Sequence, residues 1–259
     1  MDEGSLKNRI GRLWRLAATA LGFAMFGVFG VLFKIVLLPY TLRPTAGDLV
    51  RQKAARRLVS KSWYWFSLYL IRSGIVKARF HGFDKLGRPG QLILANHPSL
   101  LDVVFILGRV PEANCLIKQD LLKNPAMQSQ IAACGYLPAG EEPDFVEAVH
   151  EVLQKQCLLV FPEGTRTGWD GVVKFHRGAV SMGLRSAKSI VPLTIRMNPP
   201  NFKKGQPWYR IPAARPVYEF TVGEAVDPQQ WLAEKPLPIA ARRLNEHLQT
   251  YFNERTRNE

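Results

Sequence analysis

Cysteine is scarce in this sequence. The chain has 259 residues and three cysteines, Cys115, Cys134 and Cys157, which lie far apart and mostly among apolar residues. An odd, widely spaced set gives neither a disulfide framework nor the ligand spacing of a zinc site. The five histidines form no metal-ligand cluster in the sequence either. We therefore expect small, buried, reduced cysteines and no bound metal.

Acidic residues are few in comparison with basic ones. The chain has 21 Asp and Glu against 35 Lys and Arg, which gives a formal net charge of +14. This excess favours an anionic partner, which can be a phospholipid surface, a phosphorylated small molecule, an acidic carrier protein or nucleic acid. Charge alone does not choose among these partners. A non-catalytic basic protein that binds membranes or nucleic acid is therefore one hypothesis to weigh.

A long apolar run stands near the N-terminus. Residues Leu16–Phe33 carry no charge, and after Lys34 the run continues through Ile35–Leu38. A helix that rises about 1.5 Å per residue can cross a hydrocarbon core of about 30 Å over such a length. A signal peptide is the competing interpretation, but no clear cleavage site follows the run. A buried helix of a soluble protein is the third.

Basic residues lie on both sides of this run. The positive-inside rule then places both flanks in the cytoplasm, which one straight span cannot satisfy. A second apolar stretch, Trp63–Ile71, is rich in aromatic residues that suit the headgroup level. We expect two helices over residues 1–76 to form a membrane-embedded hairpin in one leaflet; the alternative is that the second helix packs in the core. The flanking basic residues are Lys7, Arg9, Arg12 and Arg15 before the run, and Arg43, Arg51, Lys53, Arg56, Arg57 and Lys61 after it.

From Lys77 onward, apolar strand-like runs alternate with helical stretches. Phe145–Gln156 is one such helix, and an amphipathic helix is expected from Pro238 to the C-terminus. Strands that alternate with helices indicate an α/β domain with a mainly parallel sheet flanked by helices, over residues 77–259. The predicted strands include a strand from Lys77 that enters a turn, and Leu92–Ala95, Cys115–Lys118, Cys157–Phe161, Ile190–Ile195 and Tyr218–Val222.

The sequence "NHPSLLD" is the sharpest local feature. His97 follows the buried strand Leu92–Ala95, at the end where open α/β sheets hold their ligands, and Pro98 fits the first turn of the next helix. Because His97 precedes that helix, Asp102 can lean back toward it. A carboxylate on one imidazole nitrogen fixes the tautomer and leaves the other free to accept a hydroxyl proton. Taken alone, the pair is better explained by a structural histidine.

A second turn, "VFPEGTRT", also follows a buried strand. Pro162 and Gly164 predict a tight turn with Glu163, Thr165 and Arg166 exposed at its rim. The guanidinium of Arg166 offers a rigid fork of donors that suits phosphate. Taken alone, this segment is better explained by an ordinary charged surface turn.

The segment "VKFHRGA" adds basic side chains a few residues later. Lys174, His176 and Arg177 stand beside Gly178. A basic rim that contains glycine can bind an anion, because the backbone can approach the ligand closely.

Together, four ordered blocks resemble the glycerolipid (lysophospholipid) acyltransferase family, which includes the 1-acyl-glycerol-3-phosphate acyltransferases. "NHPSLLD" is similar to the family's His-x4-Asp block and "FPEGTRT" to its Glu-Gly-Thr-Arg block. "VKFHRGA" resembles its basic-Gly segment and "IVPLTI" its Val-Pro block. The resemblance covers Gln91–Ile195, and the apolar N-terminal helices fit the family's membrane anchor.

The resemblance implies a membrane-bound O-acyltransferase of phospholipid biosynthesis at the inner (cytoplasmic) membrane, with its catalytic domain facing the cytoplasm. It would move a fatty acyl group from acyl-CoA or acyl carrier protein (ACP) to the hydroxyl of a lysophospholipid, with His97 as general base and Asp102 orienting it. No bound cofactor, metal or nucleic acid is expected. The residues expected to bind substrate are Asn96, Ser99, Lys118, Glu163, Gly164, Thr165, Arg166, Lys174 and Arg177.

One block departs from the family pattern. Members that use lysophosphatidic acid carry a Gly-x-x-Phe-Ile-x-Arg-type block, whose counterpart here is "CGYLPAGEE". Gly135 is present, but Gly140, Glu141 and Glu142 stand where the arginine is expected, and glutamates repel phosphate. Lys118, just upstream, can compensate. The same chemistry on a non-phosphatidate acceptor is therefore an alternative, and the net charge of +14 suits an acidic carrier as donor.

Overall fold

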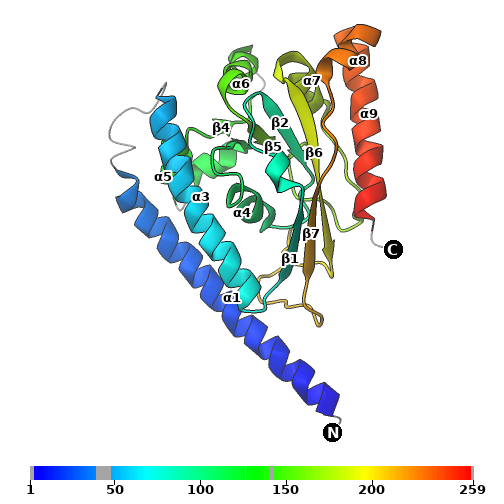
Figure 1. The fold of residues 1–259 in the computed structure, drawn as a ribbon. Helices are drawn as coiled ribbons and strands as arrows, with labels where there is room; N and C mark the ends of the chain where they lie inside the picture. The colour runs from blue at the N-terminus through cyan, green and yellow to red at the C-terminus, as the bar shows by residue number, and fades with distance from the viewer. Residues whose placement is uncertain (1–2, 39–47, 126, 141–142, 258–259) are drawn as a thin grey trace.

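The computed structural model describes residues 3–38, 48–125, 127–140 and 143–257. Side chains are described from residue 9 in the first of these ranges and from residue 144 in the last. A seven-stranded sheet lies between two layers of helices (Figure 1). The strands are β1 Lys77–His81, β2 Gln91–Ala95, β3 Asn114–Ile117, β4 Leu137–Pro138, β5 Leu158–Val160, β6 Ser189–Asn198 and β7 Val217–Val222. The helices are α1 Glu3–Val36, α3 Leu49–Arg72, α4 Asp102–Leu107, α5 Gln128–Cys134, α6 Pro143–Lys155, α7 Arg177–Ser186, α8 Pro228–Glu234 and α9 Leu237–Thr256.

The sheet confirms the predicted α/β class. Its order is β1-β7-β6-β2-β5-β3-β4, and every neighbouring pair is parallel except β6 with β7. Each strand expected from the sequence is present, while β4, with two residues, is the one that the sequence did not predict. The central strand β2 is buried along its whole length, as expected for a parallel strand covered on both faces.

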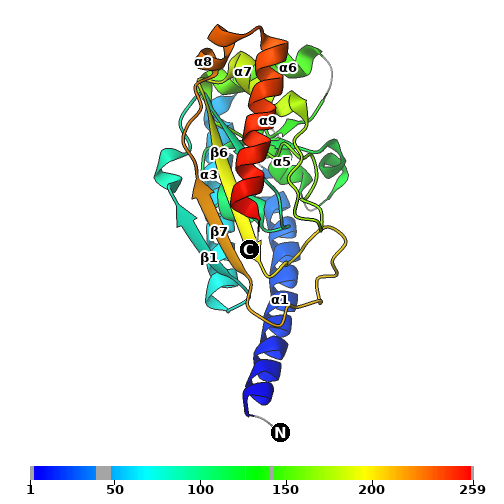
Figure 2. The ribbon, with the colours of Figure 1, turned by 90° about the vertical axis from the view of Figure 1, so that its right-hand side faces the viewer.

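Helices cover both faces of the sheet. The helices α1, α3, α4 and α5 pack on one face and α6, α7 and α9 on the other (Figures 1 and 2). Alternate residues of β2 belong to different cores: Ile93 and Ala95 face the first layer, and Leu92 and Leu94 face the second. This double coverage fixes the register of β2, and with it the point where the chain leaves the sheet after Ala95.

The first two helices lie side by side and run in opposite directions (Figure 1). The ring of Phe26 in α1 stacks on Trp63 in α3 with centroids 5.6 Å apart, and the Tyr69 hydroxyl donates to the Ala18 carbonyl at 2.7 Å. The stretch predicted to lie at the membrane surface divides in two: Trp63 is buried in the core, whereas Trp65 is exposed. The second helix thus packs in the core on one face and presents aromatic side chains on the other.

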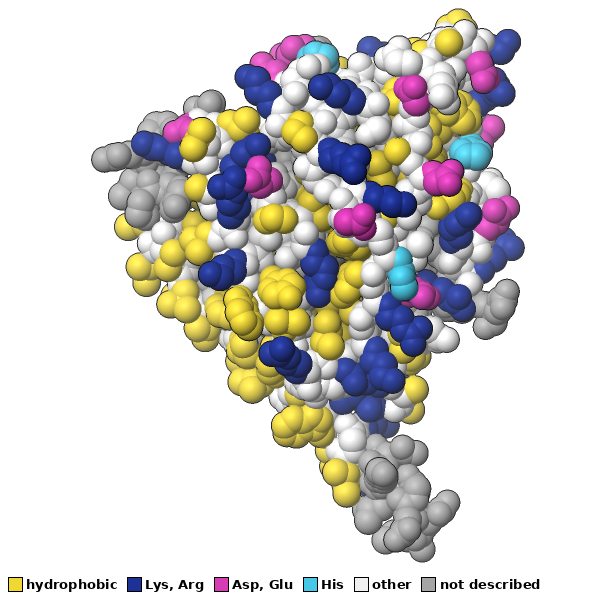
Figure 3. Space-filling view, viewed as in Figure 1, with side chains coloured by type: hydrophobic (Ala, Val, Ile, Leu, Met, Phe, Trp, Pro, Cys, Tyr) yellow, Lys and Arg dark blue, Asp and Glu magenta, His cyan; other side chains and the backbone are white. Residues whose placement is uncertain are grey.

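The outer face of α1 is apolar and exposed. Only 28% of its most apolar 18-residue window is buried. Hydrophobic side chains form a band over α1 and α3, and Lys and Arg lie along its border toward the rest of the molecule (Figure 3). The apolar band is defined by these exposed residues: Ile10, Leu13, Trp14, Leu21, Phe23, Val28, Val31, Leu32, Ile35, Val36, Leu38, Tyr64 and Trp65.

One of the basic residues predicted to flank the membrane is instead part of the core. Arg56 of α3 is 1% exposed, and its guanidinium donates to the backbone carbonyls of Cys134 and Glu112 and to the Gln156 side chain. The three cysteines are buried and free, as predicted. Burial raises the pKa of Cys115 and Cys134 to about 12 and that of Cys157 to about 11, which keeps these thiols protonated.

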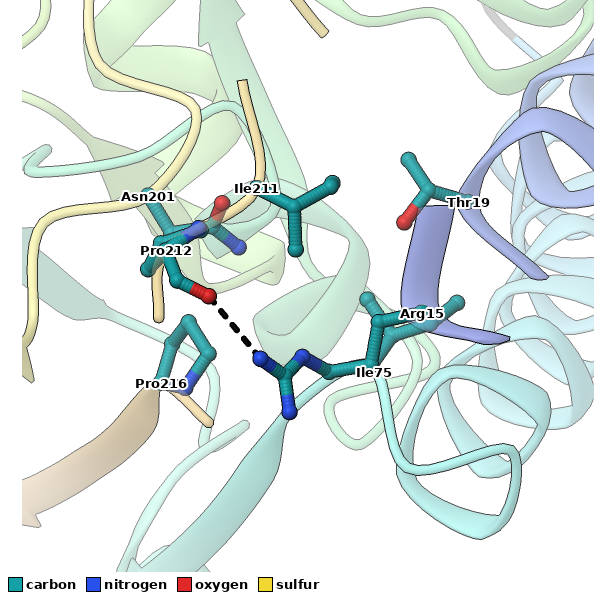
Figure 4. A pocket seen from close by; sticks show the side chains of 7 residues that line it. All are labelled: Arg15, Thr19, Ile75, Asn201, Ile211, Pro212 and Pro216. Atoms are coloured by element: carbon teal, nitrogen blue, oxygen red, sulfur yellow. Dashed lines mark hydrogen bonds between the residues drawn. The ribbon is translucent and has the colours of Figure 1, made fainter. Parts of the chain in front are cut away.

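A long loop, residues 199–216, joins β6 to β7 and reaches α1. The ring of Phe202 meets Phe23 of α1 edge to face with centroids 5.9 Å apart. Arg15 of α1 donates to the Pro212 carbonyl at 2.9 Å across a narrow crevice (Figure 4). Asn201 lines the same crevice. The apolar helix and the loop therefore form one packed unit.

Candidate active site

The parallel strands bring their carboxyl ends to one edge of the sheet, where chain segments that follow β2, β5 and β3 meet. Asn96, directly after β2, is 1% exposed. Its side chain accepts from the Ile195 backbone N–H at 2.7 Å and donates to the Ile195 carbonyl at 2.8 Å. These two bonds prolong the β2–β6 pairing by one residue. Asn96, predicted to bind substrate, therefore positions the turn that follows it.

His97 and Asp102 form a hydrogen-bonded pair. The distance from His97 Nδ1 to Asp102 Oδ2 is 2.8 Å, and the same oxygen accepts from the Ser99 backbone N–H at 2.8 Å. The helix α4 begins at Asp102, so the expectation that Pro98 starts it was wrong. The physical reason is the Asp102 carboxylate, which points back from the first residue of the helix. It accepts hydrogen bonds from His97 and Ser99 and so holds residues 97–101 as a turn.

Burial shapes the electrostatics of this pair. The Asp102 side chain is fully buried, whereas that of His97 is 18% exposed. Desolvation raises the pKa of Asp102, and the hydrogen bond from His97 opposes that shift. The imidazole stacks on Phe161 with ring centroids 4.3 Å apart. One ring nitrogen is thus held by a buried carboxylate and one ring face by an aromatic side chain, which fixes the orientation of the imidazole.

Glu163 lies inside the fold and not at the exposed rim where the sequence placed it. It is 6% exposed, and its Oε1 accepts from the His97 backbone N–H at 2.9 Å and from the Thr167 hydroxyl at 2.8 Å. The Thr167 backbone N–H also donates to the His97 carbonyl at 2.7 Å. The carboxylate is buried because it ties the two turns together. Burial raises the pKa of Glu163, and these hydrogen bonds oppose the shift.

The "FPEGTRT" segment forms the tight turn that its proline and glycine predicted. Gly164 has φ +62, and a side chain there would lie 3.3 Å from the His176 ring. Thr165 is exposed as expected. Arg166 is partly buried, and its Nη1 donates to the Phe202 carbonyl at 2.9 Å. Burial lowers the pKa of Arg166, and the charge of Asp102 opposes that shift.

The turn after His97 is supported by residues that sequence patterns did not single out. The Ser99 hydroxyl is fully buried, donates to the Asn201 carbonyl at 3.0 Å and lies 2.8 Å from the Tyr218 hydroxyl. The Leu100 backbone N–H donates to the Phe202 carbonyl at 3.1 Å. Ser99, predicted to bind substrate, thus anchors the turn to the 199–216 loop. This loop showed no periodicity that would have revealed the role.

The remaining predicted binding residues lie farther out. Lys118 follows β3 at the same sheet edge; its side chain is 69% exposed and pairs with Asp120 at 3.0 Å. Lys174 and Arg177 are exposed, and no contact between described residues joins them to His97. Residues 141–142, which carry the two glutamates of the divergent block, lie outside the described part of the chain. Among described residues, no group of three or more His, Cys, Asp or Glu is arranged to hold a metal ion.

Comparisons with known proteins show which proteins this chain resembles. Residues 77–196 match the family model "Acyltransferase". The 1-acyl-sn-glycerol-3-phosphate acyltransferase of Pseudomonas aeruginosa is 25% identical over 211 residues, covering 78% of each chain. The enzyme of the same name from Helicobacter pylori is 26% identical over 203 residues, covering 75% of this chain and 76% of the other.

A solved structure shares the fold. The 1-acyl-sn-glycerophosphate (LPA) acyltransferase PlsC from Thermotoga maritima superposes with a TM-score of 0.69 at 19% identity, covering 96% of this chain and 99% of the other. The matched family region runs from β1 into β6 and so contains both turns that meet at His97. Residues 77–196 therefore form an acyltransferase domain, and the chain is an acyltransferase.

Proposed function

We propose that this acyltransferase moves a fatty acyl group from an acyl thioester to the free hydroxyl of 1-acylglycerol-3-phosphate, with His97 as general base. The observation that carries the proposal is the 2.8 Å bond between His97 Nδ1 and the fully buried Asp102 carboxylate. The relatives from Pseudomonas aeruginosa and Helicobacter pylori, whose names specify this acceptor, support the choice of substrate.

In this mechanism, the Asp102 carboxylate holds a proton on His97 Nδ1, which leaves Nε2 as the acceptor for the substrate hydroxyl proton. As that proton moves to Nε2, the hydroxyl oxygen attacks the thioester carbonyl carbon. The tetrahedral intermediate collapses, the C–S bond breaks, and the imidazolium returns the proton to the departing thiolate. The products are an ester and a free thiol. Asp102 stabilises the imidazolium while it exists.

The donor is acyl-CoA or acyl-ACP. Both carry the acyl group as a thioester on a phosphopantetheine arm, so the chemistry at His97 is the same. The formal net charge of +14 suits an acidic carrier protein as well as the phosphates of coenzyme A. A direct comparison of the two donors at equal concentration decides between them.

We further propose that the apolar band on α1 and α3 lies in the cytoplasmic leaflet of the inner membrane. The band is exposed in the folded chain and is bordered by Lys and Arg, as in proteins that bind an anionic lipid surface (Figure 3). In this arrangement, residues 1–76 anchor the protein and residues 77–259 face the cytoplasm. Because Phe23 of α1 packs on Phe202 beside the catalytic turn, a lipid acceptor would need to leave the bilayer only in part.

The proposal is tested with purified protein, radiolabelled acyl-CoA or acyl-ACP, and an acceptor panel that includes 1-acylglycerol-3-phosphate and a neutral 1-acylglycerol. The wild type is expected to prefer the phosphorylated acceptor. His97→Ala is expected to abolish transfer while the far-ultraviolet circular dichroism spectrum and vesicle flotation stay unchanged. His247→Ala, an exposed histidine on α9, is the matched control and should retain activity.

Two results would contradict the proposal. Turnover by His97→Ala comparable to wild type would remove the assigned base. A wild type that acylates the neutral acceptor but not 1-acylglycerol-3-phosphate would keep the chemistry and replace the acceptor with a non-phosphatidate lipid.

A further inference from the structure

Lys203 occupies an unusual place for a lysine. It lies in the 199–216 loop and is 5% exposed. Its Nζ donates to the Gly168 carbonyl at 2.5 Å and lies 5.5 Å from the centroid of the Trp169 ring. A fully extended lysine side chain normally keeps its ammonium in water. Here the loop places that ammonium against the "FPEGTRT" turn, beside the residue whose backbone holds His97.

The ammonium is buried without a carboxylate at ion-pair distance among the residues that the structure describes. Burial lowers the pKa of Lys203, and the more distant Asp170 and Glu163 oppose that shift. An ammonium has three donors, and the Gly168 carbonyl accounts for one. Burying a cation is costly unless it is paired, so this position favours an anion supplied from outside the chain.

A second cation lies in the adjoining loop. Arg166 donates to the carbonyl of Phe202, the neighbour of Lys203, while Lys203 donates to the carbonyl of Gly168, two residues after Arg166. Each loop therefore donates one hydrogen bond from a cationic side chain to a backbone carbonyl of the other loop. Arg166 likewise has no carboxylate at ion-pair distance among the described residues. Both cations border the turn whose Thr167 N–H donates to the His97 carbonyl.

We propose that Lys203 binds the phosphate of the acceptor beside Arg166, which the sequence already indicated as suited to phosphate, and that Lys203 sets the preference for a phosphorylated head group. The inference rests on the proposed function. A planar guanidinium can bind two phosphate oxygens side by side, and an ammonium adds a compact charge from another direction. In 1-acylglycerol-3-phosphate, the phosphate is on the carbon next to the one that carries the reacting hydroxyl. The anion site must therefore lie beside His97, and both cations border the turn that is hydrogen-bonded to the His97 carbonyl.

This assignment also accounts for the divergent "CGYLPAGEE" block. That block lacks the arginine expected to bind phosphate, and Lys118, its nearest basic residue at the sheet edge, is already paired with Asp120 at the surface. Lys203 supplies the missing charge from a different loop. A buried cation is also a better ligand than an exposed one, since less solvent screens its interaction with the phosphate.

The test compares Lys203→Gln with Lys204→Gln, the exposed neighbouring lysine, and with Lys203→Arg. Loss of a charged hydrogen bond is expected to raise the KM for 1-acylglycerol-3-phosphate by about 10- to 100-fold in Lys203→Gln, with a much smaller change in kcat. The selectivity for the phosphorylated over the neutral acceptor should fall by at least about tenfold. Lys204→Gln should behave as wild type, and Lys203→Arg should recover most of the affinity.

Binding of glycerol 3-phosphate, measured by calorimetry without any acyl donor, separates this inference from the proposed function. Wild type should bind it and Lys203→Gln should bind it more weakly by a similar factor. Equal losses with both acceptors, or an unchanged affinity for glycerol 3-phosphate, would overturn the inference and leave Lys203 as a structural clamp on Gly168. If wild type binds glycerol 3-phosphate through Lys203 but transfers no acyl group to 1-acylglycerol-3-phosphate, the proposed function fails and the anion site stands.

Discussion

The substitution Asp102→Asn isolates the charge of the carboxylate from its geometry. In the folded chain, Asp102 Oδ2 accepts from both His97 Nδ1 and the Ser99 N–H, while Oδ1 has no hydrogen-bond partner among the described residues. An asparagine can therefore keep its oxygen at the Oδ2 position and point its amide at the unoccupied side. The hydrogen bonds and the tautomer of His97 are retained, and the negative charge is removed.

The expected loss of activity follows from the interaction with the imidazolium. Two unit charges about 4 Å apart at an effective dielectric constant of about 20 attract each other by about 4 kcal/mol. The imidazolium forms only as the hydroxyl loses its proton, so this attraction is lost in the transition state and not in the substrate complex. Because 1.36 kcal/mol corresponds to a factor of ten, kcat should fall by about 10³-fold with little change in KM.

The same substitution should remove the pH dependence that Asp102 gives to the stability of the fold. Burial raises the pKa of Asp102 above its unfolded value, so the folded state binds the proton more tightly. The free energy of unfolding therefore falls as the pH rises from the unfolded pKa to the folded pKa, and the cost persists at higher pH. Asparagine does not titrate and avoids this cost. The buried amide N–H groups of asparagine find no acceptor among the described residues at the Oδ1 position and cost about 1–3 kcal/mol at every pH, so the effect is read from the pH dependence of the free energy of unfolding.

Single-turnover kinetics with 1-acylglycerol-3-phosphate and urea denaturation as a function of pH measure the two effects. Asp120→Asn, an exposed carboxylate whose side chain is 71% accessible, is the matched control and should change neither by a measurable amount. A free energy of unfolding that depends on pH in Asp102→Asn as it does in wild type would refute the argument from burial. Activity within tenfold of wild type would refute the role of the charge.

Three further substitutions test other parts of the structure. Arg56→Ala should lower the free energy of unfolding by about 3 kcal/mol or more, because it leaves several buried acceptors unpaired. Arg57→Ala, at a surface ion pair, should cost less than about 1 kcal/mol, and urea denaturation compares the two variants. Phe23→Ala should lower kcat/KM for detergent-dissolved acceptor by up to about tenfold through the lost ring contact with Phe202, while an unchanged value would show that α1 does not support the site. Val28→Asp, on the exposed apolar band, should reduce flotation with anionic vesicles and leave activity in detergent intact.

The sheet could be predicted because its strands are covered on both faces. A parallel strand such as β2 must then be apolar throughout, and that leaves a run of residues that is visible in the sequence. Strand β4, with two residues, is too short to leave such a pattern. The start of α4 was missed because Asp102 acts through its own side chain on the preceding turn, an effect that apolar periodicity does not record.

Contacts between distant residues explain the errors at the site. Glu163 was expected at an exposed rim because turns are polar, yet its partner is the backbone N–H of His97, 66 residues away. Nothing in a single sequence pairs these groups. Arg56 was counted as a membrane flank for the same reason, since its acceptors come from α5, from the chain before β3 and from the turn between α6 and β5. The 199–216 loop left no signal except its basic residues.

Phe202 connects the apolar helix to the catalytic turn. Its carbonyl accepts from the Leu100 N–H and from Arg166, and its ring packs against Phe23 of α1. Its φ of 53° is unfavourable for a residue other than glycine, so these contacts must offset a cost of about 1–3 kcal/mol. A lipid whose tail stays beside α1 could then present its head group to Arg166 and its hydroxyl to His97 without first entering water. In this arrangement, membrane binding and acyl transfer depend on the same loop.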